Sequence, residues 1–275
     1  MITSRNIEYD LSIIIVSYNT KKLLKECITS VRESIEHLAY ELIVVDNNSH
    51  DGSPEMVMSE FKEVHLINNH ENVGFAKANN QGIALASGRY VLLLNSDTLV
   101  PYGTFETLIT FMDGQPKAAI VGPKVLNFDG TLQNKGFFFP SIGYSILTLL
   151  KLHRLLPSGV LSKIFRHYYW DENDVRPVDW VSGCCFLIRT KVIRTIGLLS
   201  EDFFMYGEEL EFCFRAKQKL YEVWYMPLVT IKHLNQGSEC KDRSALFMQA
   251  KKRLYEKIFG VNKGNLITII TLLSL

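Results

Sequence analysis

The centre of this 275-residue chain contains one segment that organises the rest, Val91-Leu92-Leu93-Leu94-Asn95-Ser96-Asp97-Thr98-Leu99-Val100. Its four leading apolar residues predict a strand buried on both faces of a sheet. In open α/β folds, ligands bind at the carboxyl ends of such strands. If the chain stays extended, Asn95 and Asp97 point to one side and Ser96 to the other. An amide and a carboxylate oxygen suit a hard divalent cation that keeps most of its waters. The alternative is that these polar residues form a turn or cap the next helix.

Strands and helices alternate three times before this segment. Apolar runs of strand length are separated by stretches whose apolar residues recur with helical spacing. This order predicts an α/β fold with a doubly wound, mixed and mostly parallel sheet and helices on both faces. We expect strands at 11–16, 42–45 and 64–67 and helices at 23–38, 55–61 and 75–86. Asn19 or Thr20 is expected to cap the first helix, and Pro101 to begin a further helix after the central segment.

Each predicted strand ends in polar residues. In a parallel sheet these ends lie along one edge, so a single crevice would collect them. The polar ends are Ser17-Tyr18-Asn19, Asp46-Asn47-Asn48, Asn68-Asn69 and Asn95-Ser96-Asp97.

Two common nucleotide-binding motifs are missing from the sequence. No G-x-G-x-x-G follows the first strand, and G-x-x-x-x-G-K-[ST] occurs nowhere, which disfavours a dehydrogenase and a P-loop phosphotransferase. Asp46 could still accept a hydrogen bond from a base N–H, and Asn19 and Asn72 could supply amide contacts. For each residue alone, a local Asx turn is the alternative.

The composition indicates an ordinary globular protein of a reducing compartment. Thirty basic and 29 acidic residues nearly balance, which argues against a nucleic-acid partner. The five cysteines, two of them adjacent at Cys184 and Cys185, have neither zinc nor disulfide-framework spacing. Residues 1–10 lack the apolar core of a signal peptide. We therefore expect a cytoplasmic protein that could act at the inner face of the cell membrane.

The second half of the chain is less regular. We expect a domain over residues 1–240 with an inserted lobe at 136–177, either a packed subdomain or a surface facing an acceptor or a membrane. Residues 178–189 return to strand character, and Gly183 within them indicates a close approach to the backbone. Another strand, at 221–225, is expected to stop at Pro227, with His233 just beyond it.

Two adjacent acids, Glu208 and Glu209, begin a predicted helix after an aromatic run. Acidic bias at a helix amino terminus is the simple explanation. Neighbouring residues on a helix differ in direction by about 100°, so the two carboxyl groups are expected to face different ways.

Residues 241–275 form a C-terminal extension. A basic helix at about 245–259 is followed by the apolar tail 266–275, which is too short to span a bilayer. The helix and tail could rest on an anionic membrane surface, or could equally pack on the domain.

Six segments in order resemble the family 2 inverting glycosyltransferases of the GT-A fold, particularly the rhamnosyltransferase-like branch of bacterial polysaccharide synthesis. The resemblance covers most of residues 11–235. The segments are VSYN (16–19), IVVDNNSHDGS (43–53), NVGFAKANNQG (72–82), LLLNSDT (92–98), VSGCCFLIR (181–189) and FFMYGEELEFCFR (203–215), followed by Pro227 and His233.

The resemblance implies transfer of a sugar from a nucleotide-sugar donor to a saccharide or lipid-linked acceptor, with inversion and with Mg²⁺ or Mn²⁺ as cofactor. It implies that Glu209, or its neighbour Glu208, is the general base. It assigns the nucleoside to Ser17, Tyr18, Asn19 and Asp46, the diphosphate to Asn72 and Lys77, the metal to Asp97 and His233 with Asn95 or Ser96 beside them, and the acceptor or sugar to Trp180, Ser182 and Gly183.

Two positions depart from the family pattern. Asn95 stands where many relatives have Asp, and Glu209 stands where Asp is usual. These departures keep two other classes open, a catalytically inactive sugar-nucleotide-binding module and a peripheral membrane assembly protein.

Overall fold

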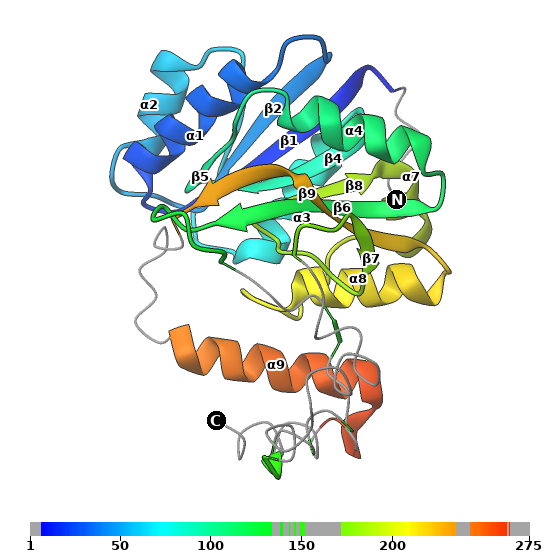
Figure 1. The fold of residues 1–275 in the computed structure, drawn as a ribbon. Helices are drawn as coiled ribbons and strands as arrows, with labels where there is room; N and C mark the ends of the chain where they lie inside the picture. The colour runs from blue at the N-terminus through cyan, green and yellow to red at the C-terminus, as the bar shows by residue number, and fades with distance from the viewer. Residues whose placement is uncertain are drawn as a thin grey trace.

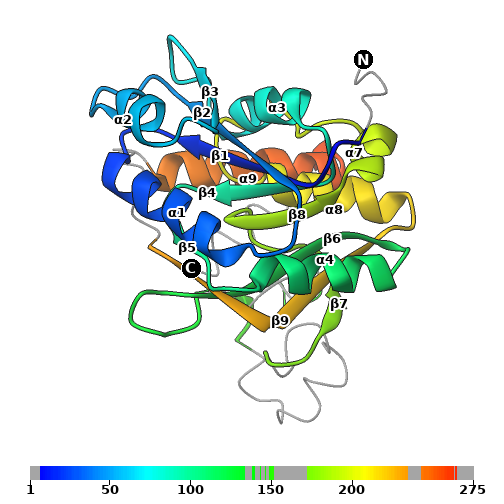
Figure 2. The same cartoon turned by 90° about the horizontal axis from the view of Figure 1, so that it is seen from above.

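The computed structural model describes residues 7–133, 138–139, 143, 146, 149–151, 172–234, 243–262 and 264. Most of the predicted inserted lobe and the whole apolar tail 266–275 lie outside these residues. The described part forms a nine-stranded mixed sheet between two layers of helices, with the helix at 243–259 outside one of these layers (Figure 1). The same layers are seen from above in Figure 2.

The first half of the chain has the predicted alternation. Strand β1 pairs in parallel with β2 on one side and β4 on the other, and β2 pairs in parallel with β3. The elements are β1 (Tyr9–Ser17), α1 (Lys21–Ser34), β2 (Tyr40–Asp46), α2 (Ser53–Glu60), β3 (His65–Asn68), α3 (Phe75–Leu85) and β4 (Gly88–Asn95).

The second half makes the sheet mixed. Strand β8 runs antiparallel between β4 and β6, and β9 pairs in parallel with β6 but antiparallel with β5 and β7. Parallel and antiparallel pairings are therefore equal in number among the described strands. The elements are β5 (Thr98–Leu99), α4 (Thr104–Gly114), β6 (Ala118–Leu126), β7 (Arg176–Val178), β8 (Cys185–Arg189), α7 (Thr190–Ile196), α8 (Glu208–Gln218), β9 (Glu222–His233) and α9 (Arg243–Phe259).

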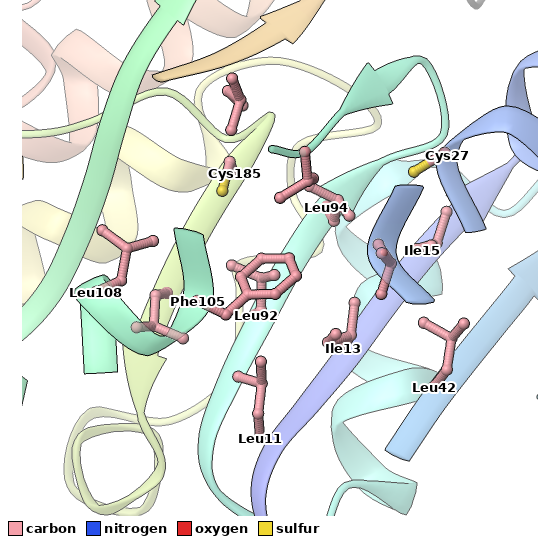
Figure 3. Close-up of a cluster of buried hydrophobic side chains, with 14 of the residues drawn as sticks. Leu11, Ile13, Ile15, Cys27, Leu42, Leu92, Leu94, Phe105, Leu108 and Cys185 are labelled. Atoms are coloured by element: carbon pink, nitrogen blue, oxygen red, sulfur yellow. The ribbon is translucent and has the colours of Figure 1, made fainter. Parts of the chain in front are cut away.

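The central strands are buried on both faces, as the apolar run in β4 predicts. Leu92 and Leu94 face the cluster that holds α1, α2 and α4, whereas Val91 and Leu93 face α3, α7 and α8. Figure 3 shows the first cluster, where Phe105 of α4 lies over Leu92. This alternation fixes the register of β4, because a slip of one residue would exchange the two faces.

Helix α3 lies close against β1. A Cβ atom placed on Gly82 would come within 2.5 Å of the Ile14 side chain, so only glycine fits this contact. The amino-terminal end of α3 is held at the end of β2 by the Asn47 side chain, which donates to the Gly74 carbonyl oxygen at 3.3 Å.

Several predicted boundaries were wrong: helix α1 ends at Ser34 rather than at residue 38, and three others differ for reasons that the structure shows. Helix α4 begins at Thr104 rather than Pro101, because Gly103 adopts a left-handed conformation with φ 74° and ends a turn there. The strand expected over 178–189 is interrupted, because β7 pairs with β9 whereas β8 pairs with β4 and β6. Strand β9 does not stop at Pro227, because a register shift opposite Pro123 and Lys124 accommodates the proline and the strand continues to His233.

Helix α9 packs on the domain. Its Ala250, Leu254 and Tyr255 bury themselves with Phe203, which precedes α8 (Figure 1). In the part of the chain that the structure describes, no helix is both long and apolar enough to cross a bilayer. Cys27, Cys184, Cys185 and Cys213 are all unpaired and buried.

Replacing Gly82 by alanine tests the contact between α3 and β1. We expect Gly82→Ala to lower the free energy of unfolding by about 1–3 kcal/mol, since the added methyl overlaps Ile14. Gly114→Ala, at the end of α4 where a Cβ atom meets nothing within 4 Å, should change it by less than about 0.5 kcal/mol. Urea unfolding measures both, and equal effects would show that the contact is not tight.

Candidate active site

The carboxyl ends of β1, β2 and β4 meet at one edge of the sheet, where α3 and α8 begin. Ser17 lies beside Asp46 in the register of β1 and β2, and Val16 lies beside Asn95 in that of β1 and β4. The prediction that the polar strand ends share one edge is therefore confirmed.

Asp46 is the buried acceptor at the end of β2. Its carboxylate oxygen Oδ2 accepts a hydrogen bond of 2.7 Å from the Ser49 backbone N–H, whereas Oδ1 is buried without a hydrogen-bond partner. Burial raises the pKa of this carboxyl group. An unsatisfied buried acceptor is costly unless a ligand supplies the donor, and a base ring N–H would do so.

Asn19 organises the loop beside Asp46. It adopts a left-handed conformation with φ 52°, and its side-chain oxygen accepts a hydrogen bond of 2.8 Å from the His50 N–H. Its own N–H donates to the Ser49 hydroxyl at 2.8 Å. Asn19 thus fixes the shape of the loop, and Tyr18 precedes it as a half-buried side chain.

A chain of hydroxyl groups connects the ends of β1 and β4. Ser17 and Thr20 lie 2.9 Å apart, and Thr20 donates to Ser96 at 3.0 Å. Thr20 occupies the position before α1 but does not cap it. The α1 cap is instead Asp51, which accepts from the Lys21 N–H at 2.7 Å, a long-range contact that no local pattern indicates.

The amino terminus of α3 carries Asn72 and Lys77. The Asn72 side-chain oxygen accepts from the Gly74 N–H at 3.0 Å, which is the Asx turn weighed as an alternative. Lys77 is exposed in the first turn of the helix. Gly74, with φ 85°, lies against Phe204, where a Cβ atom would come within 2.7 Å of the Phe204 carbonyl oxygen.

Beyond β4 the chain does not stay extended. Ser96 and Asp97 form a turn. The alternation of side chains along a strand, from which Asn95 and Asp97 were expected to point the same way, therefore does not apply here. The two side chains nevertheless meet at His233, which lies 3.0 Å from Asp97 Oδ1 and 3.1 Å from Asn95 Nδ2 through Nε2. The pairing of Thr98 with His233 between β5 and β9 brings them together.

Gln133 holds the His233 ring and was not predicted. His233 Nδ1–H donates to Gln133 Oε1 at 2.6 Å, while Gln133 Nε2 donates to the His233 carbonyl oxygen at 3.2 Å. The hairpin near residue 130 returns the chain to this place. Asp129-Gly130 indicates the turn, but nothing in the sequence pairs Gln133 with His233.

The Asp97–His233 pair fits a divalent cation. Because His233 Nδ1–H donates to Gln133, Nε2 is the ring nitrogen that faces Asp97 Oδ1 at 3.0 Å and Asn95 Nδ2 at 3.1 Å, and either a proton on Nε2 or a cation bound beside it would complete the pair with Asp97. Asn95 Oδ1 is buried without a hydrogen-bond partner and could supply a further oxygen. Among the described residues, no group of three or more His, Cys, Asp or Glu side chains is placed to hold a metal ion, so water or substrate oxygens would complete the shell.

Glu208 and Glu209 lie in the first turn of α8, where Glu208 is buried and Glu209 Oε2 accepts a hydrogen bond of 3.1 Å from the Gly207 N–H. Burial raises the pKa of Glu208 well above its usual value, and the charge of Glu209 raises it further. Burial also raises the pKa of Glu209, but backbone N–H groups and the Glu208 carboxyl oppose that rise. Glu208 therefore keeps its proton more strongly than Glu209 does.

Gly183 lies against Glu209. It sits in the turn before β8, where a Cβ atom would come within 3.6 Å of the Glu209 side chain. Ser182 in the same turn donates to the Cys184 thiol at 3.3 Å. Trp180 donates from its ring N–H to the Phe138 carbonyl oxygen at 3.3 Å. The predicted acceptor-side residues thus border the carboxyl pair through Gly183.

The sequence profile of the family described as glycosyl transferase family 2 matches residues 12–197. This match covers most of the chain and includes the ends of β1, β2 and β4. The chain belongs to glycosyl transferase family 2. Its fold is the GT-A fold, as the resemblance implied.

Known proteins similar to this family 2 chain include two curated transferases. A low-salt glycan biosynthesis hexosyltransferase, Agl10, of Haloferax volcanii is 31% identical over 82% of this chain and 67% of its own length. An N-acetylglucosaminyl-diphospho-decaprenol L-rhamnosyltransferase of Mycobacterium tuberculosis is 24% identical over 89% of this chain and 82% of its own.

A solved structure supports the fold of this family 2 chain. The mannosyltransferase PcManGT of Pyrobaculum calidifontis, in complex with GDP-Man and Mn²⁺, superimposes with a TM-score of 0.59 at 14% identity, covering 98% of this chain and 74% of that one.

The proton on Glu208 makes stability depend on pH. Because its pKa is raised in the folded state, its contribution to stability is present below about pH 4.5 and is lost as the pH rises through the folded-state pKa. We expect Glu208→Gln to become progressively more stable than the unmodified protein between about pH 5 and about pH 8. Urea unfolding across this range measures the trend, with the exposed Glu71→Gln as the control. A difference that does not vary with pH would contradict the assignment.

Proposed function

We propose that this family 2 enzyme transfers a hexose or deoxyhexose, such as rhamnose, from a nucleotide-diphosphate donor to a hydroxyl group of a saccharide or lipid-linked acceptor in cell-surface polysaccharide synthesis. The main support is that one edge of the sheet gathers an unsatisfied Asp46 oxygen, the Asp97–His233 pair and the Glu208–Glu209 pair. The names of the relatives agree with this class of reaction.

The donor would lie along the ends of β1, β2 and β4. Asp46 would accept from the base, in the loop that Asn19 shapes. Lys77 in the first turn of α3 would face the diphosphate, whose charge also favours the amino-terminal end of a helix.

Asp97, His233 and Asn95 would hold Mg²⁺ or Mn²⁺. When bound, the cation supplies Lewis-acid stabilisation of the charge that develops on the leaving diphosphate. The relative solved with GDP-Man contains Mn²⁺. Gln133 accepts from His233 Nδ1–H and so keeps Nε2 directed toward Asp97.

Glu209 would act as the general base in a single displacement. The acceptor hydroxyl oxygen attacks the anomeric carbon while its proton passes to Glu209, and the bond from that carbon to the diphosphate breaks. The nucleoside diphosphate leaves from the opposite face, so the anomeric configuration inverts. Proton removal by a positioned carboxylate typically contributes about 10²–10⁴-fold.

We further propose a cytoplasmic site of action, with membrane contact through the apolar tail 266–275. The unpaired thiols of Cys27, Cys184, Cys185 and Cys213 fit a reducing compartment. Deleting the tail and measuring vesicle binding tests the membrane contact.

Asp97→Ala tests the metal site. We expect it to abolish transfer and to remove the gain in nucleoside-diphosphate affinity that Mn²⁺ gives, because no carboxylate then binds the cation. Calorimetric titration with and without Mn²⁺ measures this, and the melting temperature checks the fold. The exposed Asp174→Ala is the control. An unchanged metal-dependent affinity in Asp97→Ala would refute the site.

Glu209→Gln tests the base. It keeps the shape of the side chain but removes its basicity, so transfer should fall by about 10²-fold or more while donor affinity stays nearly constant. Glu208→Gln should have a much smaller effect, since an amide can still donate to Glu209. Initial rates with saturating donor measure both. The reverse ranking would assign the base to Glu208, and full activity in both variants would place it elsewhere.

A further inference from the structure

Helix α9 lies against the segment that leads into the carboxyl pair. We call residues 200–207 the approach segment, because Glu208 and Glu209 follow it directly. Both the approach segment and α9 lie outside residues 12–197, which the family profile matches. In Figure 1, α9 runs below α8, on the side of α8 away from the sheet.

The approach segment ends in an unusual conformation. Tyr206 and Gly207 both have positive φ values, 72° and 94°. A left-handed conformation is ordinary for glycine but unfavourable for a bulky residue such as tyrosine, so surrounding contacts must hold it. Any relaxation at Tyr206 would move Glu209, only three residues further along the chain.

Apolar contacts from α9 hold this turn. The Tyr206 ring meets the Phe247 ring edge to face at a centroid distance of 5.9 Å. A Cβ atom on Gly207 would lie 3.9 Å from Ala250, so the helix comes close to the backbone here. Phe203 is buried in the same cluster.

Polar contacts from α9 hold the start of the approach segment. Lys257 Nζ lies 2.5 Å from Asp202 Oδ2 and donates to the Ser200 hydroxyl at 2.8 Å. The Arg253 guanidinium donates to the Asp202 carbonyl oxygen. Lys257 also lies over the Phe203 ring at 5.4 Å. Two basic side chains of α9 are thus directed at this segment.

Helix α3 holds the other side. The Phe75 N–H donates to the Phe204 carbonyl oxygen at 2.7 Å. The Asn80 side chain accepts from the Leu199 N–H at 3.1 Å and donates to Glu201 at 3.0 Å. The approach segment therefore lies between α3, which is proposed to face the nucleotide-sugar donor, and α9.

We propose that α9 positions the general base, with Phe247 and Lys257 acting through the approach segment on Glu209. This inference rests on the proposed role of Glu209. Neither Phe247 nor Lys257 is placed at the donor, so both are positioning residues. Small displacements of a catalytic group are enough to reduce the rate strongly.

The test compares Lys257→Ala and Phe247→Ala with Lys252→Ala. Lys252 lies on the same helix with its ion pair directed at Glu256 of α9 itself, so it is the matched control. We expect each of the first two variants to lower kcat for transfer by about tenfold or more, with the donor KM within about twofold of the unmodified enzyme. Lys252→Ala should leave both unchanged, and Lys257→Arg should restore much of the loss.

The decisive measurement places Lys257→Ala and Phe247→Ala in the Glu209→Gln enzyme. If α9 acts through the base, neither should lower the residual rate further, since the group it positions is already gone. The melting temperature and donor affinity of each full-length variant are measured in parallel.

Two results would overturn the inference. One is the same fold-loss from Lys257→Ala and Phe247→Ala in the Glu209→Gln enzyme as in the unmodified enzyme, which would show a general effect on the fold or on acceptor binding. The other is no loss from either variant alone. A fully active Glu209→Gln enzyme is a different outcome, since it would refute the proposed base itself.

Discussion

The double burial of β4 is the constraint on which the site depends. This strand is hydrogen-bonded to β1 and β8 and covered on both faces, so its carboxyl end has almost no freedom. The Asn95 N–H donates to the Cys184 carbonyl oxygen at 3.0 Å, and this bond extends the fixed geometry to the turn that borders Glu209. A rigid strand end thus places both the metal-binding side chains and the acceptor-side turn.

The remaining parts of the site come from segments that reach this edge by different routes. His233 arrives through the antiparallel pairing of β5 and β9, and Gln133 arrives through a hairpin after β6. The carboxyl pair arrives on α8. A mixed sheet makes this possible, because antiparallel strands bring residues from late in the chain to the same edge as the early parallel strands.

Sequence patterns predicted what depends on local physics. The apolar runs of β1, β2 and β4 and the glycine-bounded helix α3 were identified with errors of a few residues, because burial on two faces leaves a clear pattern. The turn at Ser96 was the alternative to the extended chain that the strand pattern favoured. The continuation of β9 through Pro227 and the contact of Gln133 with His233 were not predicted. Each depends on pairing between distant segments, and a register shift opposite Lys124 has no signature in β9 itself.

The buried cysteine thiols can report local opening of this protein, because each lies in a different part of the fold. Cys184 is 3% exposed at the turn beside Asn95, Cys27 lies under β4, and Cys213 lies within α8. A thiol in such a place reacts with an external reagent only when the surrounding structure opens. The modification rate of Cys184 would therefore report opening of the turn beside Asn95, that of Cys213 opening of α8, and that of Cys27 unfolding of the central sheet. No cysteine would have to be introduced by mutation.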